Sequence, residues 1–229
     1  DEICEVHGAI WISYYHDEWV QYNNGTMKLS ILIPTLPNRR KLFNALYKKL
    51  TAQIDYVHTT HPSLGQVEIL FDKSKKFLKG GLTVGGKRDA LKCKATGQYL
   101  VFVDDDDNVA PNYVQSILRL TETNPDIITF RSFYNSDNYW SIVDMNLVHS
   151  ENEQMNESVI VKRQPFHVCP IRTSIAQLHS FPDINNGEDW EWMQKVLPDC
   201  KTQAHSDMIL HQYNDFSTTS AVNEIECNK

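Results

Sequence analysis

Continuous apolar runs alternate with amphipathic stretches from residue 28 onward. The run "LSILIP" at 29–34 ends on Pro34 and is typical of a strand buried on both faces, so we expect it to be a central strand. The segment 39–50 then carries apolar side chains at helical spacing, namely Leu42, Phe43, Leu46, Tyr47 and Leu50. A second apolar run, "VEILFD" at 67–72, follows. The three segments predict a β-α-β unit.

The same alternation continues along the chain. The glycine-rich "GGLTVGGKRDALKCKATG" predicts a helix that ends at Gly97, and "YLVFV" at 99–103 predicts a strand. A helix is expected behind Pro111, followed by the strand "DIITF" at 126–130. This order predicts an α/β fold, a single domain with a mostly parallel central sheet and helices on both faces.

Acidic residues gather at the predicted carboxyl ends of these strands, where ligands bind in such sheets. Asp72 and the run 104–107 each follow a strand, as does the turn at Pro34, so three loops should converge on one crevice. Four adjacent carboxylates repel one another, and a solvated acidic turn is the alternative. Because Mg²⁺ and Mn²⁺ prefer oxygen ligands, the spacing of Asp104 and Asp106 favours a divalent-ion site.

Composition and net charge limit the kinds of molecule that the protein is expected to bind. The 229-residue chain has a formal net charge of -7, which argues against nonspecific attraction to nucleic acid or anionic membranes. It contains no apolar stretch of about 20 residues and no signal-peptide pattern at its start, so we expect a soluble, cytoplasmic protein. The sequons at Asn24 and Asn156 therefore carry little weight. No C-x-x-C pair occurs, and reduced thiols are expected at Cys4, Cys93, Cys169, Cys200 and Cys227.

The predicted domain organisation is simple. We expect residues 1–26 to form an N-terminal extension and 27–229 to form the domain, with one half at about 27–110 and a second half at about 111–215. Met27 fits either a natural start or the beginning of a second domain in a larger protein.

Four segments, "ILIPTLPNR", "VEILFD", "GGKRDALKCKATGQYLVFVDDDD" and "GEDWEWM", resemble the family-2 glycosyltransferases of the GT-A fold. The likeness extends over roughly residues 28–213. It implies that the half at about 27–110 is the nucleotide-sugar half and that the half at about 111–215 is the acceptor half. It implies transfer of a sugar from a nucleoside diphosphate, with UDP favoured, to an acceptor hydroxyl with inversion, using Mn²⁺ or Mg²⁺. Glycans are the favoured acceptors. The alternatives are a nucleotidyltransferase on a related fold and a catalytically silent sugar- or cation-binding module.

The resemblance also implies roles for residues on the donor side. Nucleotide and donor binding fall to Pro34, Thr35, Arg39, Asp72, Lys87, Arg88, Asp104 and Asp105. The implied metal ligands are Asp104, Asp106 and His211. The alternative for Lys87 and Arg88 is a solvated helix face. Asp89 stands where the family usually has asparagine, and we expect it to cap the helix or pair with Arg88.

On the acceptor side, Glu188 and Asp189 precede a predicted helix. Acids at a helix N-terminus are favoured by the helix dipole, so an ordinary N-terminal turn is the alternative. The resemblance implies that Asp189 is the general base and that Glu188 orients the acceptor. His167 and Arg172 are candidates for the sugar or acceptor pocket. For Trp190 and Trp192, core packing is favoured over stacking on a sugar.

Overall fold

The computed structural model describes residues 3–6, 9–12, 20–22, 26–74, 83–137, 139–149, 153–154 and 160–215. Both sequons and Cys227 lie outside the described residues, and the side chain of Cys4 is not described. The other three cysteines are free thiols, as predicted: Cys93, Cys169 and Cys200.

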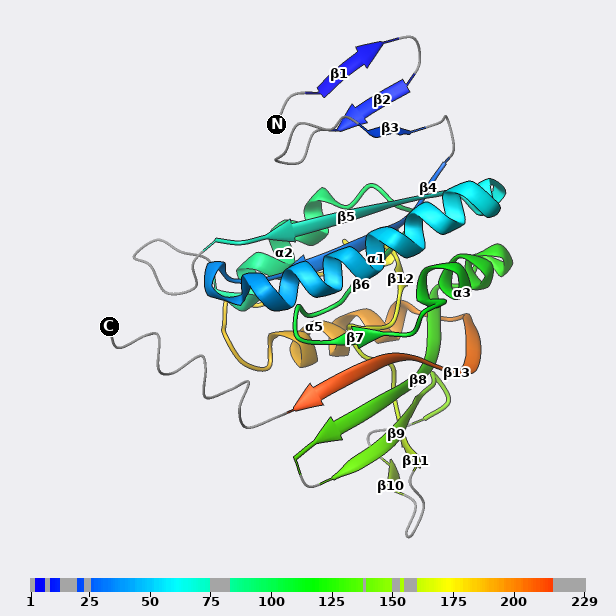
Figure 1. Ribbon diagram of the computed structural model, residues 1–229. Coiled ribbons are helices and arrows are strands. Elements are labelled where there is room, and N and C mark those ends of the chain that lie inside the picture. The colour runs from blue at the N-terminus through cyan, green and yellow to red at the C-terminus, as the bar shows by residue number, and fades with distance from the viewer. Residues whose placement is uncertain are drawn as a thin grey trace.

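The main sheet has ten strands in the order β10-β11-β9-β8-β12-β6-β4-β5, with β13 paired to β8 and β7 paired to β13 (Figure 1). Its strands are β4 (Met27–Pro34), β5 (Gln66–Asp72), β6 (Tyr99–Phe102), β7 (Asn108–Val109), β8 (Ile127–Ser136), β9 (Trp140–Met145), β10 (Glu153–Gln154), β11 (Ile160–Arg163), β12 (Ile171–Arg172) and β13 (Gln203–Asp215).

The sheet is parallel where the sequence predicted it and mixed elsewhere. Strand β4 pairs in parallel with β5 on one side and β6 on the other, and residues 29–33 are buried, so β4 is an interior strand as expected. Strand β12 is antiparallel to both β6 and β8, while β13 runs parallel to β8. The α/β class is confirmed, and antiparallel strands extend the parallel core.

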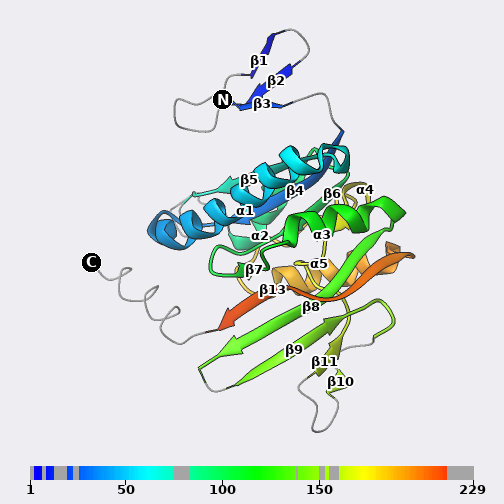
Figure 2. The ribbon, with the colours of Figure 1, turned by 45° about the vertical axis from the view of Figure 1, so that its right-hand side comes forward.

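The helices cover the sheet from both sides, as predicted. They are α1 (Arg40–Thr60), α2 (Val84–Lys94), α3 (Tyr113–Leu120), α4 (Thr173–Ala176) and α5 (Glu188–Val196), with short 3₁₀ turns at Pro37–Arg39, Pro62–Leu64, Thr121–Thr123 and Leu197–Asp199. Helices α1 and α3 pack together, and α2 contacts α5 on the opposite side of the sheet (Figure 2). The expected apolar stripe of α1 was wrong at Leu42, which is exposed because the buried face runs through Phe43, Leu46 and Leu50.

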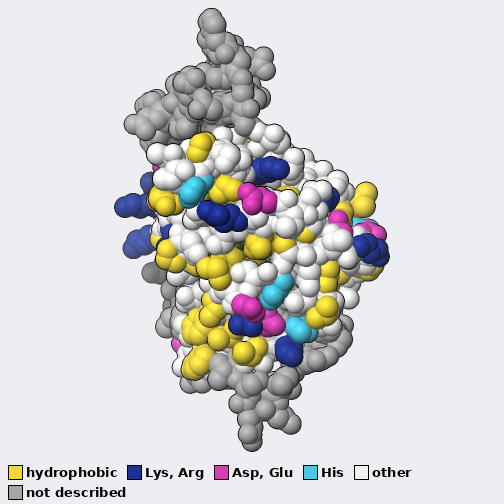
Figure 3. All heavy atoms as spheres, turned by 90° about the vertical axis from the view of Figure 1, so that its right-hand side faces the viewer, with side chains coloured by type: hydrophobic (Ala, Val, Ile, Leu, Met, Phe, Trp, Pro, Cys, Tyr) yellow, Lys and Arg dark blue, Asp and Glu magenta, His cyan; other side chains and the backbone are white. Residues whose placement is uncertain are grey.

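Charged side chains are spread over the surface. The face of the molecule in Figure 3 carries acidic, basic and histidine side chains interspersed with apolar ones, and no single-sign patch dominates it. The net charge of -7 is therefore not concentrated on this face. Within the described residues, no helix is both long enough and apolar enough to cross a bilayer.

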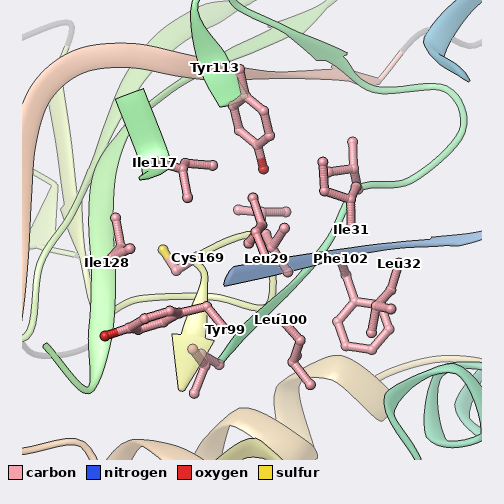
Figure 4. Packing of buried hydrophobic residues seen from close by; sticks show 14 of the residues in the cluster. Leu29, Ile31, Leu32, Tyr99, Leu100, Phe102, Tyr113, Ile117, Ile128 and Cys169 are labelled. Carbon is pink, nitrogen blue, oxygen red and sulfur yellow. The ribbon is translucent and has the colours of Figure 1, made fainter. Parts of the chain in front are cut away.

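The core lies between the helices and the parallel strands. Figure 4 shows Leu29, Ile31 and Leu32 of β4 beside side chains of β6 and α3. The buried Tyr99 hydroxyl donates a hydrogen bond to the carbonyl of Pro125 (2.8 Å), so this polar group is satisfied inside the core. Trp192 is fully buried and stacks on Phe181 with ring centroids 4.3 Å apart, which confirms its core role.

The N-terminal strands form a different sheet. Strands β1 (Ile3–Val6), β2 (Ala9–Ile12) and β3 (Val20–Tyr22) pair antiparallel in the order β1-β2-β3. The domain boundaries at residue 27 and near residue 110 remain predictions.

Candidate active site

Three loops at the carboxyl ends of β4, β5 and β6 meet at Thr35. Its backbone N–H donates to the carbonyl of Asp72 (2.9 Å), and its hydroxyl donates to the carboxylate of Asp105. The Lys87 ammonium donates to the carbonyls of Thr35 (2.8 Å) and Ser74. These bonds join residues far apart in the sequence, so the predicted convergence of the loops is confirmed.

A cavity of about 200 Å³, here called the first cavity, opens between these loops and α2. It is lined by Pro34, Thr35, Leu36, Arg39, Val84, Lys87, Arg88, Asp104, Asp106 and Tyr213. Most residues expected to bind the donor are therefore on its wall. Asp72 is not among the lining residues, and its carboxylate accepts a hydrogen bond from the Ser74 N–H (2.7 Å).

Arg88 connects the two acidic motifs. Its Nη2 lies 3.0 Å from Asp104, and its Nε lies 3.2 Å from Glu188. Lys87 and Arg88 are 3% and 4% exposed, so the alternative of a solvated helix face is wrong. Burial alone would raise the pKa of Asp104, but Arg88 and His167 hold this pKa well below its usual range. Asp104 is therefore anionic at neutral pH.

Arg39 holds the next two aspartates. One guanidinium nitrogen lies 3.0 Å from Asp105 and also contacts Asp106. Burial raises the pKa of Asp105 to about 7, although Arg39 and Thr35 act in the opposite direction. Burial also raises the pKa of Asp106. The aspartate run is thus an ion-pair network and not a solvated turn.

A second cavity of about 370 Å³ adjoins the first. It is lined by Asp104, Asp107, Ser132, Tyr134, Val143, Met145, Arg163, Phe166, His167, Val168, Asp189, His211 and Tyr213. Asp104 and Tyr213 line both cavities. A ligand in the first cavity and a ligand in the second would therefore meet at Asp104.

The acids at the start of α5 have different environments. Glu188 is 5% exposed and bonded to Arg88, whereas Asp189 lines the second cavity. One oxygen of Asp189 accepts from the Trp190 N–H (2.8 Å), as the N-terminal-turn alternative expects. Its other oxygen lies 3.3 Å from Nδ1 of His167, whose Nε2 is 3.7 Å from Asp104. His167 therefore stands between the two acids on the wall of the second cavity, where it was expected.

Both ring nitrogens of His211 have partners. Nε2 lies 2.9 Å from Asp107, and Nδ1 lies 2.8 Å from the Ser132 hydroxyl. His211 lines the second cavity but not the first. Across the described residues, no three His, Cys, Asp or Glu side chains converge to hold a metal ion. Asp104 and Asp106 do share the first cavity, which fits Mg²⁺ or Mn²⁺ completed by phosphate oxygens and water.

Two expectations were wrong. Arg172 lines neither of these cavities, because its guanidinium donates to the carbonyls of Asn124 (2.5 Å) and Pro125 (2.9 Å). Asp89 does not pair with Arg88: it accepts from the Phe181 N–H (2.9 Å) and lies 2.7 Å from Nζ of Lys92.

Sequence reasoning also missed residues of the second cavity. Tyr213 lies two residues beyond His211 on β13, so strand alternation places both on one face and would have indicated it. Arg163 and Phe166 carry no motif, and no sequence signal pointed to them.

Comparison with known proteins supports the resemblance. The family model described as "Glycosyl transferase family 2" matches residues 78–179, which contain α2 and the aspartate run. No curated protein matches this chain significantly in sequence.

Solved structures of similar fold include S. aureus TarS, with a TM-score of 0.57 and 15% identity over 82% of this chain and 37% of TarS. TarS 1-349 has a TM-score of 0.59 at 18% identity, covering 82% of this chain and 60% of that one. Its complex with UDP-GlcNAc has a TM-score of 0.55 at 14% identity, covering 82% and 59%. This chain spans at most 60% of these proteins. The chain thus resembles family-2 glycosyltransferases in sequence and has their GT-A fold.

Proposed function

We propose that this chain transfers a sugar from a nucleoside-diphosphate sugar to an acceptor hydroxyl with inversion. The observation that carries the proposal is the pair of adjoining cavities that share Asp104, with Asp189 on the wall of the second. The donor diphosphate occupies the first cavity and the acceptor occupies the second. The reacting carbon then lies at the junction between them.

The donor side supports a diphosphate ligand. Arg39, Lys87 and Arg88 line the first cavity and can donate charge-assisted hydrogen bonds to a diphosphate, although Arg39 and Arg88 also contact the aspartate run. UDP is the proposed nucleotide because TarS 1-349, of similar fold, has been solved with UDP and with UDP-GlcNAc. Lys87 also donates hydrogen bonds to the carbonyls of Thr35 and Ser74. It therefore fixes the positions of two loops of the cavity and adds positive charge to it.

A divalent ion, Mn²⁺ or Mg²⁺, is proposed at Asp104 and Asp106. When bound, it supplies positive charge that stabilises the departing diphosphate. Arg39 and Arg88 already neutralise these two carboxylates, so the side chains are held in place before any ligand arrives. His211 remains a proposed ligand, and its release from Asp107 is a condition of that role.

Asp189 is the proposed general base. An acceptor hydroxyl is a weak nucleophile until a carboxylate takes its proton. As the acceptor oxygen bonds to the anomeric carbon, its proton moves to Asp189. The bond from that carbon to the diphosphate breaks, and the electron pair leaves with the nucleotide. Attack from the second cavity on a leaving group in the first inverts the configuration.

The alternative nucleotidyltransferase makes a different product. It would release pyrophosphate from a nucleoside triphosphate and a sugar phosphate, and it would use a glycine-rich loop after the first strand, where this chain has "PTLPNRR". A silent binding module would release neither nucleotide product.

The test has two arms, each with and without Mn²⁺: a panel of nucleotide sugars, assayed for free nucleoside diphosphate, and nucleoside triphosphates with sugar phosphates, assayed for pyrophosphate. We expect UDP release from a UDP-sugar that depends on Mn²⁺ and is largely lost in Asp189→Asn. Release of pyrophosphate would support the alternative enzyme, and no release from any donor would contradict the proposal.

A further inference from the structure

Arg163 is a partly exposed cation on the wall of the second cavity, where the carboxylate of Asp189 acts on it. It lies on β11, in register with Met145 of β9, and both residues line the cavity. Its guanidinium carbon lies 4.4 Å from the centroid of the Phe166 ring. Its Nε is buried and has no hydrogen-bond partner. Over the described ranges, no ion pair includes Arg163.

The other charged side chains of the two cavities contact polar or charged groups. Arg39 and Arg88 contact aspartates, and Asp107 lies beside His211. Asp189 lies beside His167. Burial lowers the pKa of Arg163 from its ordinary value, which is the opposite of the direction for Arg39 and Arg88. Partial burial of this guanidinium therefore outweighs the attraction of Asp189, which forms no ion pair with it among the described residues.

We propose that Arg163 binds a negatively charged group of the acceptor, either a carboxylate or a phosphate. This inference rests on the proposed function and specifies its acceptor as one that carries a negative charge. A guanidinium presents forked N–H donors that match both anions bidentately. Stacking on Phe166 holds its plane before the ligand arrives, so less freedom is lost on binding.

The rest of the same sheet face suits a sugar or polyol. Tyr134 of β8 and Tyr213 of β13 are cross-strand partners whose rings stack with centroids 5.6 Å apart. Both line the second cavity. Aromatic faces pack against the C–H groups of sugars. The cavity thus combines a surface for the carbon skeleton with a cation for the charge.

The test uses two pairs of probes that differ in charge: methyl glucuronide with methyl glucoside, and glycerol phosphate with glycerol. Binding is titrated by NMR, without donor, to the wild type, Arg163→Gln, Arg163→Lys and Lys162→Gln. Lys162 is the next residue on β11, so its side chain points to the opposite face, and its change removes the same charge.

We expect at least one anionic probe to bind about tenfold tighter than its neutral partner, as a charge-assisted hydrogen bond provides. This preference should persist in Lys162→Gln, weaken in Arg163→Lys and fall to about onefold in Arg163→Gln. The pair that shows it identifies the anion as a carboxylate or a phosphate. Equal binding of charged and neutral probes to the wild type would overturn the inference, as would a preference that survives Arg163→Gln.

Thermal unfolding of Arg163→Met separates ligand binding from a structural role. Replacing a partly buried cation that forms no ion pair with an apolar side chain should leave the melting temperature unchanged or raise it. A marked fall would assign Arg163 to the fold and overturn the inference. The experiments distinguish failure of this inference from failure of the proposed function. UDP-dependent transfer without Arg163-dependent anion binding removes only this inference, whereas anion binding without transfer removes only the proposed function.

Discussion

The first and second cavities differ in how their charges are satisfied. On the first, Arg39 and Arg88 bind the aspartate run, and Lys87 holds the loops together. On the second, aromatic and apolar side chains of β8, β9 and β13 surround Arg163, whose Nε has no hydrogen-bond partner, and His167, which lies 3.3 Å from Asp189. A pre-organised charged site suits one constant ligand, the diphosphate. A looser site with unpaired groups suits chemistry and acceptor choice.

The largest expected effect falls on the second cavity. Asp189→Asn keeps the side-chain size and its bond to the Trp190 N–H but cannot take a proton. Transfer should fall by roughly 10²-fold to 10⁴-fold while UDP binding persists. Steady-state turnover and calorimetry measure the two properties. Glu191→Gln, an exposed acid in the same helical turn, is the matched control. Near-normal turnover in Asp189→Asn would move the base elsewhere.

The next largest effect is expected on the free energy of unfolding, from Arg88, which contacts both Asp104 and Glu188. Arg88→Ala leaves the buried Glu188 and the anionic Asp104 without their cation, which should cost about 3–5 kcal/mol in the free energy of unfolding. Denaturant titration measures the loss. Arg40→Ala, an exposed arginine at the start of α1, should change it little. Equal stabilities of the two variants would show that the Arg88 network does not hold the site.

A smaller effect is expected from Arg39→Gln in the first cavity. Loss of one charge-assisted contact to the diphosphate should weaken UDP binding by roughly tenfold to a hundredfold. Calorimetry gives the affinity, with Arg40→Gln as the control of equal charge. If both variants bind UDP as the wild type does, the diphosphate does not occupy the first cavity.

The smallest effect is a pH dependence of stability. The pKa of Asp105 is raised to about 7 in the folded protein, against an ordinary value of 3.8. Between these values the folded state keeps a proton that the unfolded state has lost. The free energy of unfolding should therefore fall by at least about 1 kcal/mol as pH rises from 4 to 7 in metal-free buffer. Asp105→Asn should flatten this slope, and an equally steep slope in the variant would contradict the assignment.

The first cavity was predictable because its loops directly follow apolar runs. The turn at Pro34 and the run 104–107 each come after a buried strand, and parallel strands bring their carboxyl ends to one edge. The partner of each aspartate in the run 104–107 was not predictable, because four identical side chains give no indication of which way each one points. In the structure Asp105 contacts Thr35 and Asp107 contacts His211.

The second cavity was mostly out of reach of sequence reasoning. It is assembled from β8, β9, β11 and β13, whose order depends on the antiparallel insertion of β12 between β6 and β8. Arg163 and Tyr213 share a face of the sheet because of how their strands are aligned with their neighbours. No feature of the nearby sequence predicts that alignment. Arg172 was misplaced for the same reason. Beyond the aspartate run, Asp189, His167 and His211 were the residues of this cavity that the sequence analysis named.

The most direct test of the two-cavity account is UDP binding by calorimetry, with and without Mn²⁺, for the wild type, Asp106→Ala and Asp189→Asn. Asp106 belongs to the first cavity and Asp189 to the second. The account predicts Mn²⁺-dependent binding that is lost in Asp106→Ala and kept in Asp189→Asn. Binding that is independent of Mn²⁺ and equal in all three proteins would contradict it.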